Sequence, residues 1–572
     1  MTAAIIALLA VATGCNRDPP AGTADLLGAT PDLRMKSGIG DPCMSVGGST
    51  QGTCNAGQVC LPDNPQLGTI DGYCTAICSN NQPCPSDATC LNNGGFSICM
   101  LDCDNDADCR VPDYACQDAG GSHKVCVPIN QSGNGGGVPA GTNDGGACVL
   151  PRIKPADVDG GVFGRNVQLS GAGQSLEAEV ELAVDRANQH IVVSWNTLTG
   201  NGQLGVIHSG DDGMTWDKAR LLPPDTTVDK NREQSDPVVA VDGLGDFYVS
   251  WVGFDRSQQN PNPTNMHVWV AKSTNNGAAW SNVHQVSPDN EWAQGGFLDK
   301  PWIGVNPLDD SLVVTWDQAA SQVGPVNIRM ARSTDGGKTW SAPMSVNDPG
   351  KRAQIDRNLA QIAFNQAGAG YIVWVEIDDD LFGSTQNAVY LQAFNPDGTM
   401  SGANVKVTAG ADSPVFDDPS VAADRDNVYV GFISGTPRGV WDVRVAASLD
   451  GGATFTPSVK ANDDPSCATH FHHQIVTDEN GNVHAAWYDN RYLDGNVFYA
   501  WSPPADRMNK LGFGRNQFVN DVAFTFTTRR DMANWLGDYL GLWSAGNEIY
   551  AAWTDNRAAN RSHIYFARGK SP

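Results

Sequence analysis

The chain has 572 residues, more than one ordinary domain contains. Its formal net charge is −26, and 17% of its residues are charged. Nucleic acids and anionic membrane surfaces attract basic proteins, so this balance argues against either as the main partner. An acidic surface is compatible with binding of divalent cations or simply with solubility.

The first fifteen residues have the composition of an export signal. Residues 2–13 are apolar and small, and this stretch is too short to span a bilayer as a helix. It ends in Ala-Thr-Gly-Cys at Cys15, which resembles the lipobox of bacterial lipoproteins, although Ala12 stands where that family usually has Leu. The resemblance implies a lipoprotein-type signal over residues 1–15 and lipidation of Cys15. We expect an exported protein at a bacterial cell surface, in the periplasm or secreted, with only a lipid anchor in the membrane.

Cysteine usage agrees with export and divides the first part of the chain. Of fifteen cysteines, thirteen lie from Cys43 to Cys148, which indicates an oxidising compartment and a disulfide framework. Residues 16–42 form a polar spacer, 43–127 a Cys-rich repeat module, and 128–147 a Gly-rich linker. If Cys15 is lipidated, fourteen cysteines remain, and we hypothesise that Cys148 pairs with the distant Cys467.

An acidic run lies inside the Cys-rich module, from Asp102 to Asp108. Its clustered oxygens are candidate calcium ligands, but the spacing does not match an EF-hand loop. A solvated acidic loop is the alternative. A zinc site is the weaker interpretation, because the module has no paired Cys-x2-Cys motifs.

Residues 148–572 contain a repeat of about 55–65 residues, which predicts propeller blades. The repeated unit is a turn followed by an alternating strand that ends in an aromatic residue. The seven instances end at Trp195, Trp251, Trp316, Trp374, Phe432, Trp487 and Trp553. We predict an all-β, seven-bladed propeller of four-stranded antiparallel blades, in which residues 162–169 complete the last blade and close the ring. Six blades are the alternative.

Four turns share an eight-residue pattern, clearest from Ser333 to Trp340. The pattern recurs from Ser209 to Trp216, from Ser273 to Trp280 and from Ser448 to Phe455. Asp335 can accept hydrogen bonds within its own turn, and Gly337 can supply a positive φ. The pattern resembles the Asp-box of the sialidase-like β-propellers. This resemblance is specific for fold, and it implies glycoside hydrolysis only weakly.

Polar residues precede the predicted inner strands, and blade topology brings these positions to one mouth of the central channel. They are Glu177, Glu179, Asp236, Asp299, Lys300, Asp356, Arg357, Asp417, Asp418, His472, His473, Asp538 and Tyr539. The residues after the blade aromatics join the same mouth, and they include Asp317, Glu376, Asp489, Arg491, Asp555 and Arg557. Such convergence of carboxylates, cations and a tyrosine is typical of an active site.

The resemblance assigns candidate roles in a sialidase-type reaction. Tyr539 is the candidate nucleophile, and Asp299 or Asp356 the candidate acid/base. The candidate substrate-binding cations are Arg357, Arg491, Arg557 and Lys300. The family's Phe/Tyr-Arg-Ile-Pro motif, which carries the first clamp arginine, is absent.

Two of these assignments have alternatives. Several carboxylates around one axis repel one another unless hydrated or bound to a cation, so calcium is a candidate ligand of Asp236, Asp417, Asp418 and Asp538. The Trp-x-Asp-Asn-Arg sequences at Trp487 and Trp553 fit a buried Asp–Arg pair that shapes each blade equally well.

The sequence therefore favours a surface protein that hydrolyses or binds extracellular glycans. The first hypothesis is an exo-sialidase-type glycoside hydrolase. The alternative is a non-catalytic module for binding or adhesion to a glycan, glycoprotein or protein, and a purely architectural role is the third possibility. No phosphate-binding loop, dinucleotide fingerprint or zinc-protease motif is present.

Overall fold

The computed structural model describes two units of the chain. In the first, it describes residues 59–61, 73–75, 84, 88–92, 97–103, 114–118 and 124–128. In the second, it describes residue 155 and residues 162–571, apart from loops at 172–175, 198–201, 223–232, 257–262, 293–295, 321–325, 349–354, 379–386, 411, 416, 426, 436–440, 465–467, 493, 507–509, 526–535 and 558–560. Cys15, Cys148 and Cys467 lie outside these residues, so lipidation and the Cys148–Cys467 pairing stay predictions.

The described part of the first unit contains three short antiparallel hairpins. They are β1 (Val59–Leu61) with β2 (Tyr73–Thr75), β3 (Ala88–Asn92) with β4 (Ser97–Leu101), and β5 (Tyr114–Asp118) with β6 (Lys124–Pro128). A disulfide joins Cys84 to Cys99, and Cys103 and Cys126 are also disulfide-bonded. Disulfides stabilise a unit with so few large apolar residues mainly by restricting its unfolded chain.

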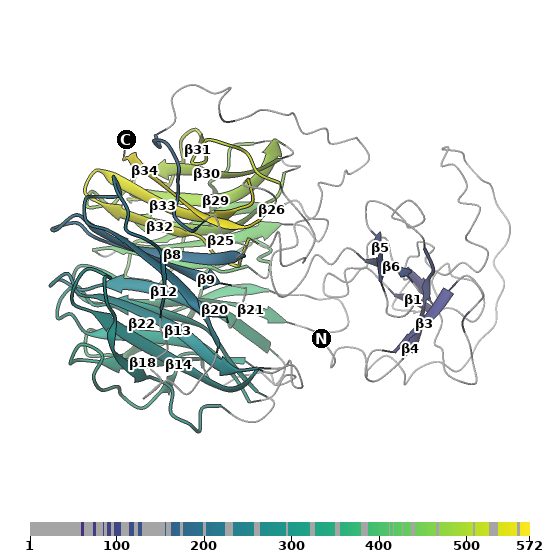
Figure 1. Ribbon diagram of the computed structural model, residues 1–572, viewed down its shortest axis with the longest axis horizontal. Coiled ribbons are helices and arrows are strands. Elements are labelled where there is room, and N and C mark those ends of the chain that lie inside the picture. The colour runs from purple at the N-terminus through teal and green to yellow at the C-terminus, as the bar shows by residue number, and fades with distance from the viewer. Residues whose placement is uncertain are drawn as a thin grey trace. The chain divides into compact units, whose positions relative to one another are not determined.

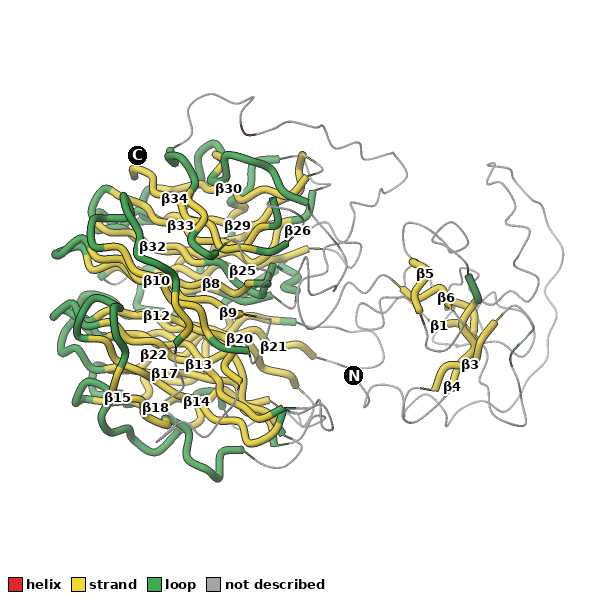
Figure 2. The backbone as a smooth tube through the Cα atoms, in the orientation of Figure 1, coloured by secondary structure: helices red, strands yellow, loops and turns green. Residues whose placement is uncertain are grey.

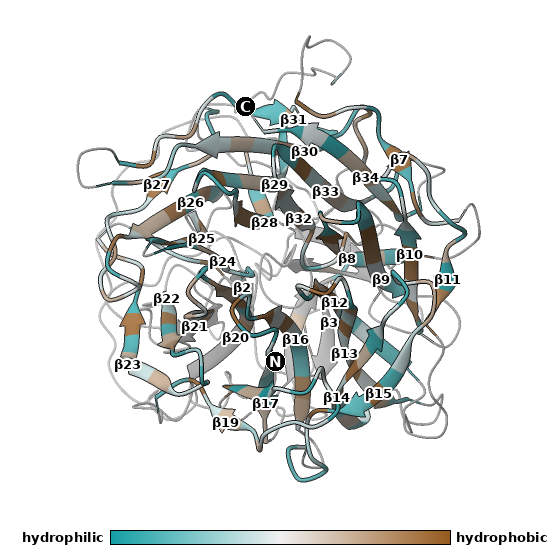
Figure 3. Cartoon of the chain, turned by 90° about the vertical axis from the view of Figure 1, so that its left-hand side faces the viewer, coloured by the Kyte–Doolittle hydropathy of each residue, from teal (hydrophilic) through white to brown (hydrophobic). Residues whose placement is uncertain are grey.

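The second unit is a β-propeller of seven four-stranded antiparallel sheets (Figure 1). The inner strands are β8 (Glu177–Asp185), β12 (Glu233–Val241), β16 (Phe297–Val305), β20 (Ile355–Phe364), β24 (Ser420–Asp424), β28 (His470–Thr477) and β32 (Gly541–Ala545). The second strands are β9 (His190–Thr197), β13 (Phe247–Asp255), β17 (Leu312–Ala319), β21 (Gly370–Asp378), β25 (Asn427–Gly435), β29 (Val483–Tyr492) and β33 (Glu548–Asp555). Viewed along the channel, the inner strands lie at the centre of a ring (Figure 3).

The third and fourth strands form the periphery. The third strands are β10 (Leu204–Ser209), β14 (Thr264–Ser273), β18 (Val326–Ser333), β22 (Ala388–Phe394), β26 (Trp441–Ser448), β30 (Asp494–Ser502) and β34 (His563–Lys570). The fourth strands are β11 (Arg220–Leu221), β15 (Ser281–Gln285), β19 (Met344–Ser345), β23 (Met400–Lys406), β27 (Val459–Lys460), β31 (Gln517–Phe518) and, in the last blade, β7 (Val167–Gln168). The described residues contain strands and loops but no α-helix, and therefore no helix that would cross a membrane (Figure 2).

The seven blades and their closure confirm the fold expected from the sequence. β7 precedes the first blade in the chain but pairs with β34 in the last, with Gln168 opposite Tyr565 and Val167 opposite Phe566. This pairing joins the two ends of the propeller sequence and covers the edge of β34.

The core lies between neighbouring blades. The aromatic residue near the end of each second strand is buried, and Trp251, Trp316, Trp374, Trp487 and Trp553 are among the largest side chains that are fully buried. Burial of a large aromatic side chain stabilises a fold by about 1.5–3 kcal/mol. The aromatic that ends each predicted unit is therefore a packing residue.

The four repeated turns follow the third strands, at the end of each blade opposite the predicted mouth. In the turn that follows β18, the Ser333 hydroxyl accepts a hydrogen bond from the amide of Gly337 at 3.0 Å, and Asp335 Oδ1 accepts one from the amide of Thr339 at 2.9 Å. The other three turns repeat both bonds, as in Gly452 to Ser448 at 2.8 Å. Side-chain oxygens thus satisfy the turn amides, which explains the spacing of the pattern.

Candidate functional site at the channel mouth

Five of the seven inner strands contain a β-bulge at the mouth of the channel. Pairing with the second strand shifts between Ala178 and Glu181 in β8, and at the corresponding places in β12, β16, β20 and β28. One residue in each bulge is not glycine yet has a left-handed backbone, namely Glu179 (φ 55°), Asp236 (57°), Lys300 (46°), Leu359 (67°) and His472 (46°). This conformation is unfavourable for residues with a Cβ, so backbone strain is concentrated at this mouth.

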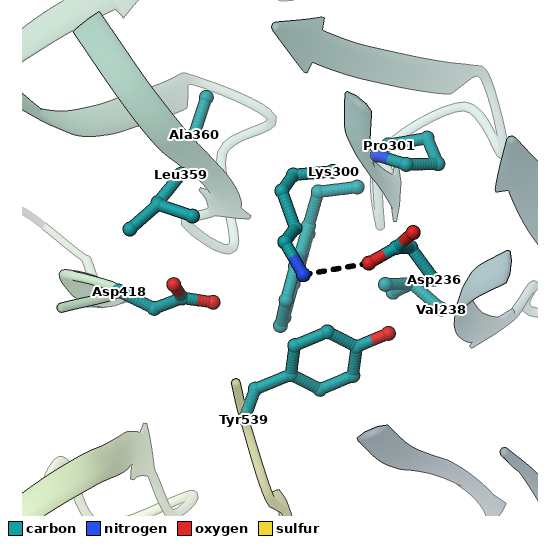
Figure 4. Close-up of a pocket in the computed structure, with 9 residues that line it drawn as sticks. Asp236, Val238, Lys300, Pro301, Leu359, Ala360, Asp418 and Tyr539 are labelled. Atoms are coloured by element: carbon teal, nitrogen blue, oxygen red, sulfur yellow. Dashed lines mark hydrogen bonds and ion pairs between the residues drawn. The ribbon is translucent and has the colours of Figure 1, made fainter. Parts of the chain in front are cut away.

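Lys300 joins its own blade to three others at the mouth. Its Nζ atom lies 2.8 Å from Glu179 Oε1, 2.6 Å from Asp236 Oδ1 and 2.6 Å from Asp538 Oδ2. The lysine side chain is 12% exposed, and none of the three carboxylates is more than 18% exposed. The Lys300–Asp236 contact is drawn in Figure 4. We call these four residues the Lys300 cluster.

The electrostatics of the cluster follow from burial and from this one ammonium group. Burial alone would lower the pKa of Lys300, but the carboxylates of Asp236, Asp538 and Glu179 outweigh it and hold that pKa well above its usual value. Burial and the neighbouring Asp236 raise the pKa of Glu179 well above the ordinary value. At Asp538, the opposing attraction of Lys300 and His472 outweighs burial and lowers the pKa. The cluster therefore combines a fixed cation with carboxyls of different proton affinity.

Three further carboxyl groups surround the cluster. Burial, reinforced by Asp236, raises the pKa of Asp299 to about 7. Burial also raises the pKa of Asp317 and of Asp418 well above the ordinary aspartate value. A protonated carboxyl both donates and accepts hydrogen bonds, so these groups suit a ligand rich in hydroxyls.

The cluster does not fit the calcium site expected from the sequence. Asp236 and Asp538 converge on the ammonium of Lys300, which takes the central position that a cation would need. Asp417 instead accepts hydrogen bonds from the amide of His472, at 3.2 and 3.1 Å to its two oxygens. Among the described residues, no group of three or more His, Cys, Asp or Glu side chains has an arrangement that would hold a metal ion.

Tyr539, the candidate nucleophile, lies beside the cluster, with its ring over the Lys300 ammonium. Its hydroxyl donates a hydrogen bond to the carbonyl of Pro237 at 3.2 Å, and its ring packs edge-on against Trp302 with centroids 5.6 Å apart. The side chain is 2% exposed. Burial, together with the charge of Glu179, raises its pKa well above the ordinary tyrosine value. A nucleophilic hydroxyl is activated by an adjacent general base or by a lowered pKa, whereas this hydroxyl bonds to a backbone carbonyl.

A small cavity opens beside Lys300 and Tyr539 (Figure 4). Its other lining residues are Asp236, Val238, Pro301, Trp302, Leu359, Ala360 and Asp418. The structure thus brings together four of the predicted site residues, Asp236, Lys300, Asp418 and Tyr539, around one cavity. Asp299 and Asp538 adjoin Lys300 and Tyr539 in the chain.

Arg491 and Arg557 form internal pairs. Arg491 Nη2 lies 2.6 Å from Asp489 Oδ2, and the guanidinium stacks on Phe498 at 4.1 Å from the ring centroid. Arg557 repeats the pair with Asp555 at 2.7 Å. Neither arginine lines the cavity beside Tyr539. This is the repeated Asp–Arg pair within the blade that the sequence offered as an alternative. The side chains of Asp356 and Arg357 lie outside those that the structure describes.

His472 and His473 have different surroundings. His472 Nδ1 lies 3.4 Å from Asp417 Oδ2, and neither ring nitrogen has a hydrogen-bond partner among the described residues. The ring of His473 faces Gly431 of β25, where an added Cβ would lie 2.6 Å from Nε2. The sequence places Glu179 at the mouth without a role, and it offers His472 and His473 as metal ligands or, as the favoured alternative, as hydrogen-bonded histidines of the channel. The bulges at Glu179 and His472 had no signal in the sequence, because a bulge depends on pairing with another strand.

The comparison with curated proteins identifies one relationship. The chain is 24% identical over 317 residues to a sialidase of Bacteroides fragilis strain YCH46, which covers 49% of this chain and 50% of the sialidase. This confirms the resemblance to sialidase-like propellers. The chain spans about half the length of that relative. No family model matches the chain.

Solved structures with a similar propeller have low sequence identity. A Hadza microbial sialidase is 14% identical, with 66% of this chain and 76% of that chain covered and a TM-score of 0.40. A polysaccharide lyase of the ulvan lyase family PL25 is 12% identical, with 71% and 96% covered and a TM-score of 0.45. An α-L-arabinofuranosidase of Fusarium graminearum is 10% identical, with 72% and 98% covered and a TM-score of 0.41.

Proposed function

We propose that the propeller recognises an extracellular glycan at the channel mouth, and that this glycan is neutral or carries amino groups. The observation that carries the proposal is the Lys300 cluster. It places one ammonium among three carboxylates next to a cavity, so no cation at the cluster is free to hold an anionic sugar. Sugar hydroxyls can instead pair with carboxyl groups of either protonation state.

The sequence relationship to a sialidase supports a glycan as the class of ligand, whereas the geometry disfavours a sialic acid. A sialoside brings a carboxylate, which is recognised best by bidentate arginine. Arg491 and Arg557 already form ion pairs with Asp489 and Asp555. The predominantly acidic mouth also repels an anion.

A glycan array with the purified full-length chain tests this proposal. Neutral and amino-sugar oligosaccharides are expected to bind, and Asp236→Asn is expected to weaken binding. The matched control is Gln189→Gly, at an exposed turn away from the mouth. Binding only to sialylated glycans, or equal binding by the Asp236→Asn variant, would contradict the proposal.

A second candidate function is glycoside hydrolysis, which the state of Asp299 favours. Its carboxyl is next to Lys300 in the chain, and burial raises its pKa to about 7. A general acid must hold its proton near the working pH, as this group would. Fluorogenic glycosides, including a sialoside, test the candidate with and without calcium. Hydrolysis that Asp299→Asn removes while glycan binding persists would support it, and turnover that depends on Tyr539 would assign that residue a part.

We also propose that the protein acts outside the cytoplasm, held by a lipid on Cys15. The apolar segment before Cys15 and the disulfide between Cys84 and Cys99 support this location. Mass spectrometry of the mature N-terminus after bacterial expression should find an acylated cysteine in the wild type and none in Cys15→Ser. An unprocessed N-terminus in the wild type would contradict the anchor.

A further inference from the structure

The left-handed bulge residues have a second feature in common, which concerns their backbone amides. The amide of Asp236 donates to Asn196 Oδ1 at 2.9 Å, and Asn196 belongs to the preceding blade. The amide of Leu359 donates to Asp317 Oδ2 at 2.9 Å, again from the preceding blade. The amide of His472 donates to both oxygens of Asp417, which precedes β24 of the preceding blade.

The bulges at Lys300 and Glu179 have other supports, the first from a neighbouring residue in the chain and the second from the last blade. The amide of Lys300 donates to its neighbour Asp299 at 3.0 Å. Glu179 is packed against Gly537, where an added Cβ would lie 2.5 Å from the Glu179 nitrogen. The glycine is therefore required for this close approach of two backbones.

Two of the three supporting side chains occupy equivalent positions in their blades, whereas Asp417 precedes an inner strand. Asn196 and Asp317 each follow the buried aromatic of their second strand, Trp195 and Trp316. All three supporting side chains are buried, and Asp317 is 0% exposed although it is a carboxyl. Burying a polar side chain costs free energy unless it is hydrogen-bonded, and at each position the amide of the bulge residue supplies that hydrogen bond.

We propose that the five bulge residues form the ring of ligand contacts at the mouth, and that Asn196, Asp317 and Asp417 are positioning residues that aim them. The inference rests on the proposed glycan site and adds Leu359 and His472 to it. Strained residues persist where the surrounding structure over-determines them, and they concentrate at functional sites. Here each support fixes the amide of a strained residue and so fixes the direction of its side chain into the channel.

His472 is the bulge residue whose polar side chain lacks hydrogen-bond partners in the described part of the chain. Its side chain is 7% exposed, and its two ring nitrogens have no hydrogen-bond partner among the described residues. A buried imidazole without partners is costly to retain. Asp417 accepts hydrogen bonds from the His472 amide, and its Oδ2 lies 3.4 Å from Nδ1, while Nε2 is a buried nitrogen with no hydrogen-bond partner among the described residues.

The test compares two substitutions of Asp417 with one of His472 in the full-length protein. Asp417→Asn keeps a side-chain oxygen for the His472 amide, whereas Asp417→Ala removes it. His472→Asn keeps a residue that tolerates the left-handed backbone but removes the ring. Affinity for the oligosaccharide that the wild type binds most tightly on the array is measured by titration calorimetry, and thermal unfolding is recorded for each variant.

The expected affinities distinguish a role in positioning His472 from a general effect on folding. Asp417→Ala and His472→Asn should weaken binding about tenfold or more, as the loss of one hydrogen bond to a ligand does, while Asp417→Asn stays within about threefold of the wild type. Gln189→Gly, at a left-handed residue in an exposed turn, should bind as the wild type does. Full affinity in His472→Asn, or equal losses in the two Asp417 variants, would overturn the inference.

A ligand-independent measurement distinguishes the two possible failures. Hydrogen exchange of the amides in β28 should accelerate in Asp417→Ala and remain slow in Asp417→Asn. A wild type that binds no glycan would overturn the proposed function and the contact ring with it. Unchanged exchange in Asp417→Ala would overturn the positioning role alone, even if glycan binding is found.

Discussion

The ammonium of Lys300 and the carboxylate of Asp538 lie 2.6 Å apart, although 238 residues separate them in the chain. Lys300 is in the third blade, and Asp538 precedes the inner strand of the seventh. The pair therefore connects blades across the channel, and with Glu179 and Asp236 it makes Lys300 the electrostatic centre of the mouth.

Replacement of Lys300 by methionine should strongly destabilise the propeller at neutral pH. The change leaves three buried carboxylates without their cation, and breaking a buried ion pair costs about 3–5 kcal/mol. The loss should shrink near pH 5, because buried carboxyl groups that have lost their cation favour the neutral form and take up protons more readily as the pH falls. Urea denaturation at both pH values measures the difference. Equal stability of the variant and the wild type at pH 7 would show that the cluster is not coupled in this way.

His470 should add stability that disappears in alkali. Burial would lower its pKa, but Asp489 and Asp464 outweigh burial and raise it to about 9, above the ordinary value of 6.5. A raised histidine pKa gives a contribution that is fully present below pH 6.5 and is lost as the pH rises through 9, in total about 3 kcal/mol. His470→Gln should remove this slope. The difference in urea midpoint between wild type and variant, followed from pH 6 to 9.5, checks it, and parallel curves would contradict it.

Asp299 should have the opposite influence over a lower range. Its pKa is raised to about 7 from the usual 3.8, mainly by burial and next by Asp236. The folded state therefore holds a proton that the unfolded state has lost, and this group's contribution falls as the pH rises from about 4 to 7. Asp299→Asn keeps the oxygen that accepts from the Lys300 amide. The variant should gain about 1 kcal/mol or more relative to wild type at pH 8 compared with pH 4, measured by denaturation.

The turn after β18 should tolerate no side chain at Gly337. This glycine has a φ of +82°, and its amide is held by the Ser333 hydroxyl. Gly337→Ala should cost about 1–2 kcal/mol, because a Cβ disfavours the left-handed region. Gly512→Ala is the matched control, since an added Cβ there meets no atom within 4 Å. Thermal unfolding compares the two, and similar midpoints would contradict the prediction.

Much of the fold could be predicted because its signals are local. A few consecutive residues are enough to predict a hydrogen-bonded turn such as Ser333 to Trp340 or an alternating strand such as β17. The same patterns recur along the chain, which makes the prediction of blades more specific. The chemistry of the candidate site was harder to predict from the sequence. Topology alone predicts that Asp236, Lys300, Asp418 and Tyr539 lie at one mouth. It does not predict that Asp236 and Asp538, two of the candidate calcium ligands, contact the ammonium of Lys300.

The two arginines show why the roles of side chains are harder to predict from sequence than the fold. Arg491 and Arg557 follow the blade aromatics as predicted, yet each turns back onto an aspartate two residues earlier. A sequence gives the position of a residue along its strand, but not which of several partners its flexible side chain will choose.

The sequence by itself determined the blade repeat, the number of blades, the closing strand and the collection of polar residues at one end of the channel. These depend on periodicity and turn chemistry over short stretches of chain. Only the tertiary structure decided that Lys300 pairs with carboxylates from three other blades and that five inner strands contain a β-bulge. It also decided that burial and nearby charges give the aspartates of the mouth different proton affinities. Those properties depend on burial and on distances between residues up to several hundred positions apart, which exist only once the ring has closed.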